Sequence, residues 1–261
     1  MSRIISFSIF IMFSVINLHG IIVGNPSDPC LYTNGLISSC AKNYSFRISY
    51  LYNNVYKGKF QDKFPTLSST PSDIRYLLQA SIATFNIYNR LDLYAILGTT
   101  NLQIDQMVYT NRKFAWGAGF KVLLYKQNCF DLSLDGKYFQ TNQKPQYFVV
   151  DKSVYPLATS LQQTLEEYQA SLALSYKTNF LIPYIGTTFL YSVITPEPKG
   201  GLLTLPGGES LFFDTSDSIS REKWGMALGI SIINKKNQAN LNIETRIFDQ
   251  NAFSFLGTLR F

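Results

Sequence analysis

The chain ends on NAFSFLGTLRF, residues 251–261, a stretch that alternates between two kinds of residue. Every odd-numbered residue from Phe253 to Phe261 is phenylalanine, leucine or glycine, whereas Ser254, Thr258 and Arg260 fall on the opposite face of an extended strand. In a water-soluble sheet, an uncovered edge of this kind promotes aggregation. In an outer-membrane barrel the last strand pairs with the first, so that no edge remains. The stretch therefore favours a transmembrane β-barrel, with Phe261 as a candidate assembly signal.

The first twenty residues have the pattern of an export signal. Arg3 precedes an apolar stretch, Ile4 to Val15, that is too short to span a bilayer, and Gly20 is a small residue at a plausible cleavage point. An N-terminal membrane anchor is the alternative. We expect residues 1–20 to be a signal peptide, 21–42 a periplasmic N-terminal segment and 43–261 the outer-membrane barrel.

The two-residue period recurs along the whole mature chain and indicates strands. The predicted fold is an all-β, antiparallel, up-and-down transmembrane barrel of ten counted strands, within a range of 10–16. The counted strands lie near 43–57, 75–88, 90–99, 112–126, 128–140, 165–178, 180–194, 219–234, 237–248 and 251–261. Further strand candidates are Ser69 to Asp73, Tyr147 to Val150, and a small hairpin made by Leu202–Leu205 and Leu211–Phe213.

The joints between these strands alternate between short and long. Short periplasmic turns and long external loops are typical of outer-membrane barrels, so the last strand is expected to return to the periplasmic side. The composition agrees with a lipid-facing surface, because charged residues make up 15% of the chain, against about 25% in soluble domains. A soluble β-sandwich is the alternative fold, and it explains neither the turn asymmetry nor the terminal strand.

Strand parity predicts which charged residues point into the barrel, since Arg or Lys facing lipid at mid-bilayer costs about 2–4 kcal/mol. The predicted channel lining is Arg47, Arg90, Asp92, Lys121, Asp131, Asp135, Lys137, Lys177, Glu244 and Arg246. Six of these ten are basic, which favours weak anion selectivity. Four glycines at interior positions leave room and favour an open bore: Gly117, Gly119, Gly225 and Gly229.

The sequence argues against an enzyme, a metal site and a nucleic-acid partner. The one histidine, His19, lies in the predicted signal, so the mature chain has no histidine base. We expect no catalytic residues, no metal and no cofactor, and the scattered basic residues give no nucleic-acid footprint. Cys30, Cys40 and Cys129 are disulfide candidates in an oxidising periplasm. One arrangement pairs Cys30 with Cys40 and leaves Cys129 for a partner chain; the alternative is a free thiol at Cys129.

Several stretches, taken together and in order, resemble the chlamydial major outer membrane proteins. They are VGNPSDP (23–29), NIYNRLDL (86–93), QASLALSY (169–176), PYIG (183–186) and the tail from Glu244 to Phe261. The resemblance implies an outer-membrane porin, usually trimeric, that passes small solutes and stiffens the envelope through disulfide-linked partners. This chain is shorter, chiefly in its loops, and has few cysteines.

Two functions remain open from the sequence. The first is a passive aqueous channel for small solutes that is also a structural envelope protein. The second is a structural or adhesive barrel whose lumen is narrow or plugged. A barrel of ten strands lies between the eight that side chains fill and the 16 that leave an aqueous channel, so the count does not decide between them.

Overall fold

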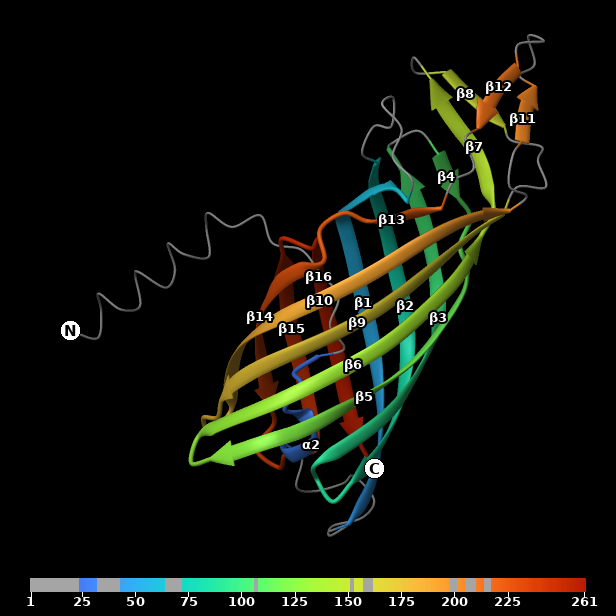
Figure 1. Cartoon of the computed structure of the whole chain (residues 1–261). Coiled ribbons are helices and arrows are strands. Elements are labelled where there is room, and N and C mark those ends of the chain that lie inside the picture. Colours follow the sequence, from blue (N-terminus) through green and yellow to red (C-terminus); the bar gives the residue numbers. More distant parts are fainter. Residues whose placement is uncertain are drawn as a thin grey trace.

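The computed structural model describes residues 24–31, 43–63, 72–105, 108–150, 153–156, 162–197, 201–204, 210–213 and 217–261. Ten long antiparallel strands form a closed ring, because each pairs with the next and the last pairs with the first (Figure 1). These strands are β1 (Tyr44–Asp62), β2 (Ser72–Ile87), β3 (Leu91–Ile104), β5 (Lys113–Gln127), β6 (Phe130–Gln143), β9 (Gln162–Tyr176), β10 (Leu181–Glu197), β14 (Trp224–Ile233), β15 (Ala239–Ile247) and β16 (Gln250–Arg260). The predicted fold class and strand count are confirmed.

The ring closes through the terminal stretch that decided the fold. β16 pairs with β1 in antiparallel register from Arg47 opposite Arg260 to Gly58 opposite Gln250. The backbone amide of Phe261 adds a hydrogen bond of 2.9 Å to the carbonyl of Phe46. The alternating tail therefore has a partner along its whole length.

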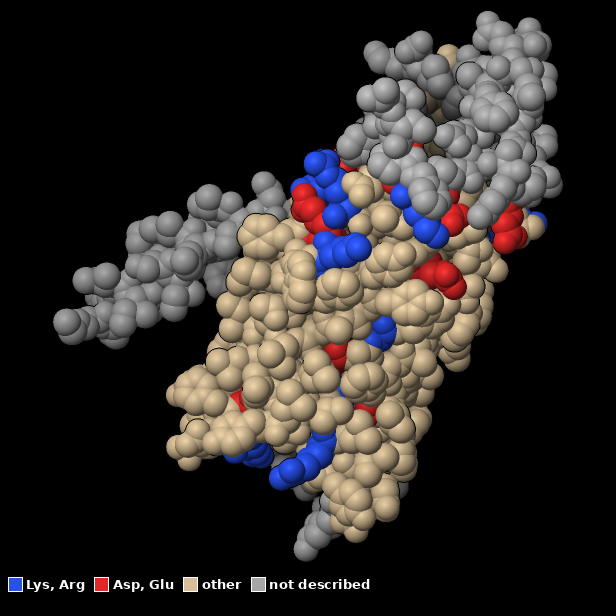
Figure 2. All heavy atoms as spheres, in the orientation of Figure 1, with Lys and Arg blue, Asp and Glu red and all other residues tan. Residues whose placement is uncertain are grey.

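Alternation along each strand separates an apolar outer face from a buried inner face. On β1 the outward residues Tyr44, Phe46, Ile48 and Tyr50 are exposed, and the residues between them are buried. Figure 2 shows the consequence on one side of the molecule: a broad band almost without charge, with Lys, Arg, Asp and Glu gathered at its two ends. This is the surface expected of a barrel that faces lipid.

The barrel wall is uneven in height. β14, β15 and β16 have 10, 9 and 11 residues, whereas β1 and β10 have 19 and 17. The short strand β13 (Ser218–Ser220) pairs with both β1 and β10 and so completes the wall above the shorter strands (Figure 1).

Five more short strands lie at the long-loop end, beyond the ring. β4 (Val108–Thr110), β7 (Pro145–Val150) and β8 (Ser153–Pro156) extend the sheet from β3, and β11 (Gly201–Thr204) forms a separate hairpin with β12 (Ser210–Phe213). The candidate stretch Tyr147–Val150 and the small hairpin are thus strands, but neither enters the barrel wall. Ser72 and Asp73 belong to β2, and residues 69–71 lie outside the described part.

The inside of the barrel holds packed apolar side chains as well as polar ones. A middle layer consists of Leu51, Leu78, Ala80, Ile82, Tyr94, Ile96, Ala115, Phe139 and Leu256. An upper layer, toward the long loops, consists of Val55, Phe60, Ile74, Tyr76, Leu102, Leu165, Ile194 and Ala252. Because both layers are buried apolar clusters, the interior departs from the expected wet bore lined by ionic groups. Within the described ranges, no helix is long and apolar enough to cross a membrane.

Candidate functional site in the barrel lumen

Most of the predicted lining residues do point into the barrel. Eight of the ten are buried on barrel strands: Arg47, Asp92, Lys121, Asp131, Asp135, Lys137, Glu244 and Arg246. Their role as the lining of a conducting channel stays a prediction.

Arg90 and Lys177 lie outside the barrel strands, so strand parity does not place either of them in the lumen. Arg90 is exposed in the turn between β2 and β3, where Tyr88 and Asn89 adopt positive φ angles of 52° and 54° that end the strand. Lys177 follows directly after β9 and is half-buried. Parity assigns a face only as long as the strand continues, and it does not locate the strand's end.

Residues 24–31, here called the docking segment, lie inside the barrel at the short-turn end, where Figure 1 shows the one-turn helix α2 (Asp28–Leu31). All eight residues are buried. The Asn25 amide donates to the Ser231 hydroxyl at 3.0 Å and accepts from Ser175 at 2.9 Å. The Ser27 hydroxyl donates to Ser175 at 2.8 Å. Side chains of the segment therefore bind side chains of β14 and β9.

The prediction of a periplasmic N-terminal segment at residues 21–42 did not include any packing inside the barrel. The part that the structure describes, 24–31, is folded into the lumen. The physical reason is that its amide, hydroxyl and carboxylate groups find buried polar partners on the wall, which strand periodicity does not reveal. The predicted signal peptide, residues 1–20, lies outside the described residues.

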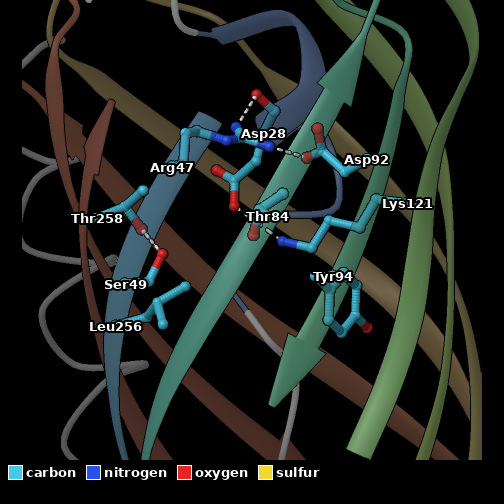
Figure 3. Close-up of a pocket in the computed structure, with 9 residues that line it drawn as sticks. All are labelled: Asp28, Arg47, Ser49, Thr84, Asp92, Tyr94, Lys121, Leu256 and Thr258. Atoms are coloured by element: carbon cyan, nitrogen blue, oxygen red, sulfur yellow. Dashed lines mark hydrogen bonds and ion pairs between the residues drawn. The ribbon is translucent and has the colours of Figure 1, made fainter. Parts of the chain in front are cut away.

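The Asp28 carboxylate is the most strongly held group of the docking segment. The Lys121 ammonium group donates to its Oδ2 at 2.8 Å, and the Asn240 amide donates to its Oδ1 at 3.2 Å. The Arg47 guanidinium donates to its backbone carbonyl at 2.9 Å (Figure 3). Burial raises the pKa of the Asp28 carboxyl, and the nearby Lys121 and Arg47 oppose that rise. Three strands, β1, β5 and β15, thus converge on one residue.

Further buried charges are paired along the inner wall. Arg47 forms an ion pair with Asp92, and Arg246 forms one with Asp249 at 2.5 Å. All four side chains are almost completely buried. Arg246 and Asp249 are three residues apart, and Arg47 and Asp92 lie on strands separated only by β2, so each pair belongs to one part of the wall.

The space around the Asp28 site is small. A cavity of about 10 Å³ is lined by Asp28, Arg47, Ser49, Thr84, Asp92, Tyr94, Lys121, Leu256 and Thr258 (Figure 3). That volume is enough for about one water molecule. Tyr94 and Leu256 also belong to the middle layer, so the docking segment lies directly against apolar packing.

The interior glycines do not leave the bore open. A Cβ on Gly119 would lie 2.5 Å from the Tyr94 hydroxyl, and one on Gly229 would lie 2.3 Å from the Tyr184 hydroxyl. A Cβ on Gly225 would lie 2.1 Å from a carboxylate oxygen of Asp249. At these three positions another side chain fills the space beside the glycine. The glycines therefore do not widen the bore as expected from the sequence.

Two of the three cysteines are described, and both are free thiols. Cys30 is buried in α2, where its Sγ donates to Oδ2 of Asp131 at 3.1 Å and burial raises the pKa of its thiol. Cys129 is exposed in the short turn between β5 and β6. Cys40 lies outside the described residues, so its pairing with Cys30 stays a prediction.

Sequence reasoning missed the docking segment and Asp249. The segment's turn-forming run, Asn25 to Asp28, carried a signal, since Asn, Pro, Ser and Asp favour a compact turn over an extended linker. Its hydrogen-bond partners on the wall lie from 19 to 212 residues away in sequence, so no local pattern identifies them.

The comparisons with known proteins give distant relatives of one kind. No family model matches the chain. The chain is similar to the major outer membrane porin, serovar D, of Chlamydia trachomatis, with 24% identity over 379 aligned positions that cover 95% of this chain and 96% of the relative. It is also similar to the major outer membrane porin of Chlamydia psittaci, with 22% identity, 91% of this chain and 89% of the relative covered. The 379 aligned positions exceed the 261 residues of this chain by 118, so the relative carries long insertions.

Among solved structures, the outer membrane protease OmpT from Escherichia coli is 10% identical, with 84% of this chain and 94% of that chain covered and a TM-score of 0.39. Nothing about function follows from so distant a likeness.

The closed ring, the apolar outer face and the names of the sequence relatives agree on location. The relatives support the resemblance to the chlamydial porins at the level of distant homology. The chain is an integral β-barrel of a bacterial outer membrane, with chlamydial major outer membrane porins among its distant relatives.

Proposed function

We propose that the protein is a structural, non-enzymatic outer-membrane barrel whose lumen is occluded in its resting form. The observation that carries the proposal is the occupied lumen. The docking segment fills the short-turn end, and the middle and upper apolar layers fill the barrel beyond it. Opening a continuous aqueous path requires removing both the segment and some of this apolar packing.

The paired charges support the same proposal. Arg47 pairs with Asp92, and Arg246 pairs with Asp249, within neighbouring parts of the inner wall. Buried ion pairs of this kind are costly to desolvate, and leaving one partner alone costs more, so they favour a rigid, fixed interior. A rigid barrel suits an envelope scaffold.

A passive channel for small solutes is the second candidate, and the printed names of the sequence relatives favour it. In this barrel it requires a state in which the docking segment has left the lumen and the middle layer has loosened. The ten-strand ring is narrow, so the pore of such a state would be small.

Conductance across a planar bilayer tests the two candidates. Protein folded in detergent, verified by a heat-dependent shift in gel mobility, is expected to give no single-channel steps. A variant with residues 24–31 replaced by glycine and serine, combined with Leu51→Ala and Phe139→Ala, is expected to conduct. Regular steps from the unmodified protein would contradict the occluded scaffold and establish the channel.

The partners are also proposals. Outer-membrane lipid is the partner that the exposed apolar band supports. A homotrimer and disulfide-linked envelope proteins follow from the family resemblance, and the exposed Cys129 thiol is available for such a link. Non-reducing electrophoresis of cell envelopes, with Cys129→Ser as the matched variant, tests the link; monomer alone in the unmodified protein would contradict it.

A further inference from the structure

We propose that the lumen wall carries a carboxylate-binding site that the chain fills with its own Asp28. The wall residues Lys121 and Asn240 recognise the carboxylate, and Arg47 holds the backbone beside it. A small carboxylate ion binds there when the Asp28 side chain is absent. The proposal goes beyond the scaffold function, and its test does not use conductance, so the two can fail separately.

The donors form a built site. The residues Lys121, Arg47 and Asn240 are 3%, 3% and 5% exposed, and they come from three strands, β5, β1 and β15. Lys121 is charged and meets one carboxylate oxygen at 2.8 Å, while Asn240 meets the other at 3.2 Å. Two donors on the two oxygens of one carboxylate are the arrangement by which proteins commonly recognise this group.

The occupant behaves as a ligand that is tethered to the barrel. The docking segment belongs to no wall strand. Its further side-chain hydrogen bonds join Asn25 and Ser27 to serines of the wall and the Cys30 thiol to Asp131. The wall strands pair with one another independently of the segment, so the site does not depend on it for backbone pairing.

The two neighbouring carboxylates have hydrogen-bond partners other than Lys121. Asp92 already forms an ion pair with Arg47, and the Asn86 amide holds its other oxygen at 2.6 Å. Tyr94 donates to the Asp135 carboxylate at 2.8 Å. These two neighbouring carboxylates are thus bound elsewhere, and the ion pair between Lys121 and Asp28 is the contact that a variant at Asp28 removes.

Chemical rescue tests the proposal. Asp28→Ala deletes one carboxylate, the group that formate supplies. The readout is the rate at which a maleimide modifies Cys30, measured by mass spectrometry of the reduced full-length protein folded in detergent. Cys30 is buried in the same segment and Cys129 is exposed, so Cys129 is the internal reference. The substitution is expected to accelerate Cys30 modification by about tenfold or more.

Formate at about 100 mM is expected to slow Cys30 modification in the Asp28→Ala protein, since weak single-group ligands bind in the millimolar range. Chloride at equal ionic strength and neutral formamide are expected to have no such effect. Formate is also expected to have no effect on Asp28→Asn, where the amide fills the space, or on the Asp28→Ala/Lys121→Met double variant.

Ser27→Ala is the matched control within the segment. It removes the hydrogen bonds to Ser133 and Ser175 but keeps the carboxylate, so Cys30 modification should accelerate without any response to formate. The heat-dependent mobility shift verifies that each barrel is folded. If formate leaves folded Asp28→Ala unchanged, or if chloride slows the reaction equally, the carboxylate site is refuted.

Discussion

At its short-turn end the lumen holds the docking segment, which contacts the wall through hydrogen bonds and the ion pair between Asp28 and Lys121. Farther along the barrel, the interior is filled by side chains of the wall strands themselves, such as Leu51 and Phe139. The first region is closed by a segment that belongs to no wall strand, so its departure breaks no strand pairing. The second can open only if the wall deforms. The same kind of substitution should therefore cost different amounts in the two regions.

The largest expected effect comes from breaking an ion pair whose two members belong to the wall. Arg246 forms its ion pair with Asp249 and donates to Gln169 at 2.7 Å, with no exposed surface. Arg246→Met leaves the Asp249 carboxylate buried without this partner, which is expected to destabilise the barrel by about 3–5 kcal/mol. Denaturant unfolding in detergent micelles measures the free energy.

Lys121→Met is the matched variant at the other end. Its partner Asp28 can leave the lumen with the docking segment and become hydrated, so we expect a loss of less than about 2 kcal/mol. Equal losses from the two variants would mean that the segment is as fixed as the wall.

A large-to-small change in the middle layer should have the next largest effect. Leu51 has no exposed surface, so Leu51→Ala leaves a cavity among packed neighbours and is expected to cost about 3 kcal/mol in the same unfolding measurement. The outward-facing Ile48 on the same strand gives the control, since Ile48→Ala leaves no enclosed cavity. A Leu51→Ala loss no larger than that of Ile48→Ala would contradict a packed interior.

The outer face allows the sharpest test of orientation. Leu97 is exposed near the middle of β3, so Leu97→Arg places a charge in lipid and should cost about 2 kcal/mol or somewhat more. Phe130 is the first residue of β6, at the short-turn rim, and Phe130→Arg should cost less than about 1 kcal/mol. The free energy of unfolding in lipid bilayers measures the cost of each substitution. A larger cost for Phe130→Arg than for Leu97→Arg would contradict a lipid-facing band centred on the middle of β3.

The sequence predicted the outer face well and the contents of the lumen poorly. Alternation is a local property, so the neighbouring residues alone assign Tyr44 and Phe46 to the outer face and Arg47 to the inner face. The docking segment is held by residues such as Asn240, 212 positions from Asp28, and such contacts leave no periodic trace. Strand parity does not place Arg90 either, because its strand has already ended at a turn with positive φ angles.

The smallest expected effect comes from the ion pair between Lys57 and Asp73 on the long-loop rim. Their charged groups lie 2.9 Å apart, but the side chains are 45% and 44% exposed, so water screens their attraction. A double-mutant cycle with Lys57→Met and Asp73→Asn should give a coupling below about 1 kcal/mol, and it should fall further in high salt. A coupling as large as that of Arg246 with Asp249 would mean that the rim is as dry as the lumen. Burial, and not the presence of an ion pair, is what should set the cost in this barrel.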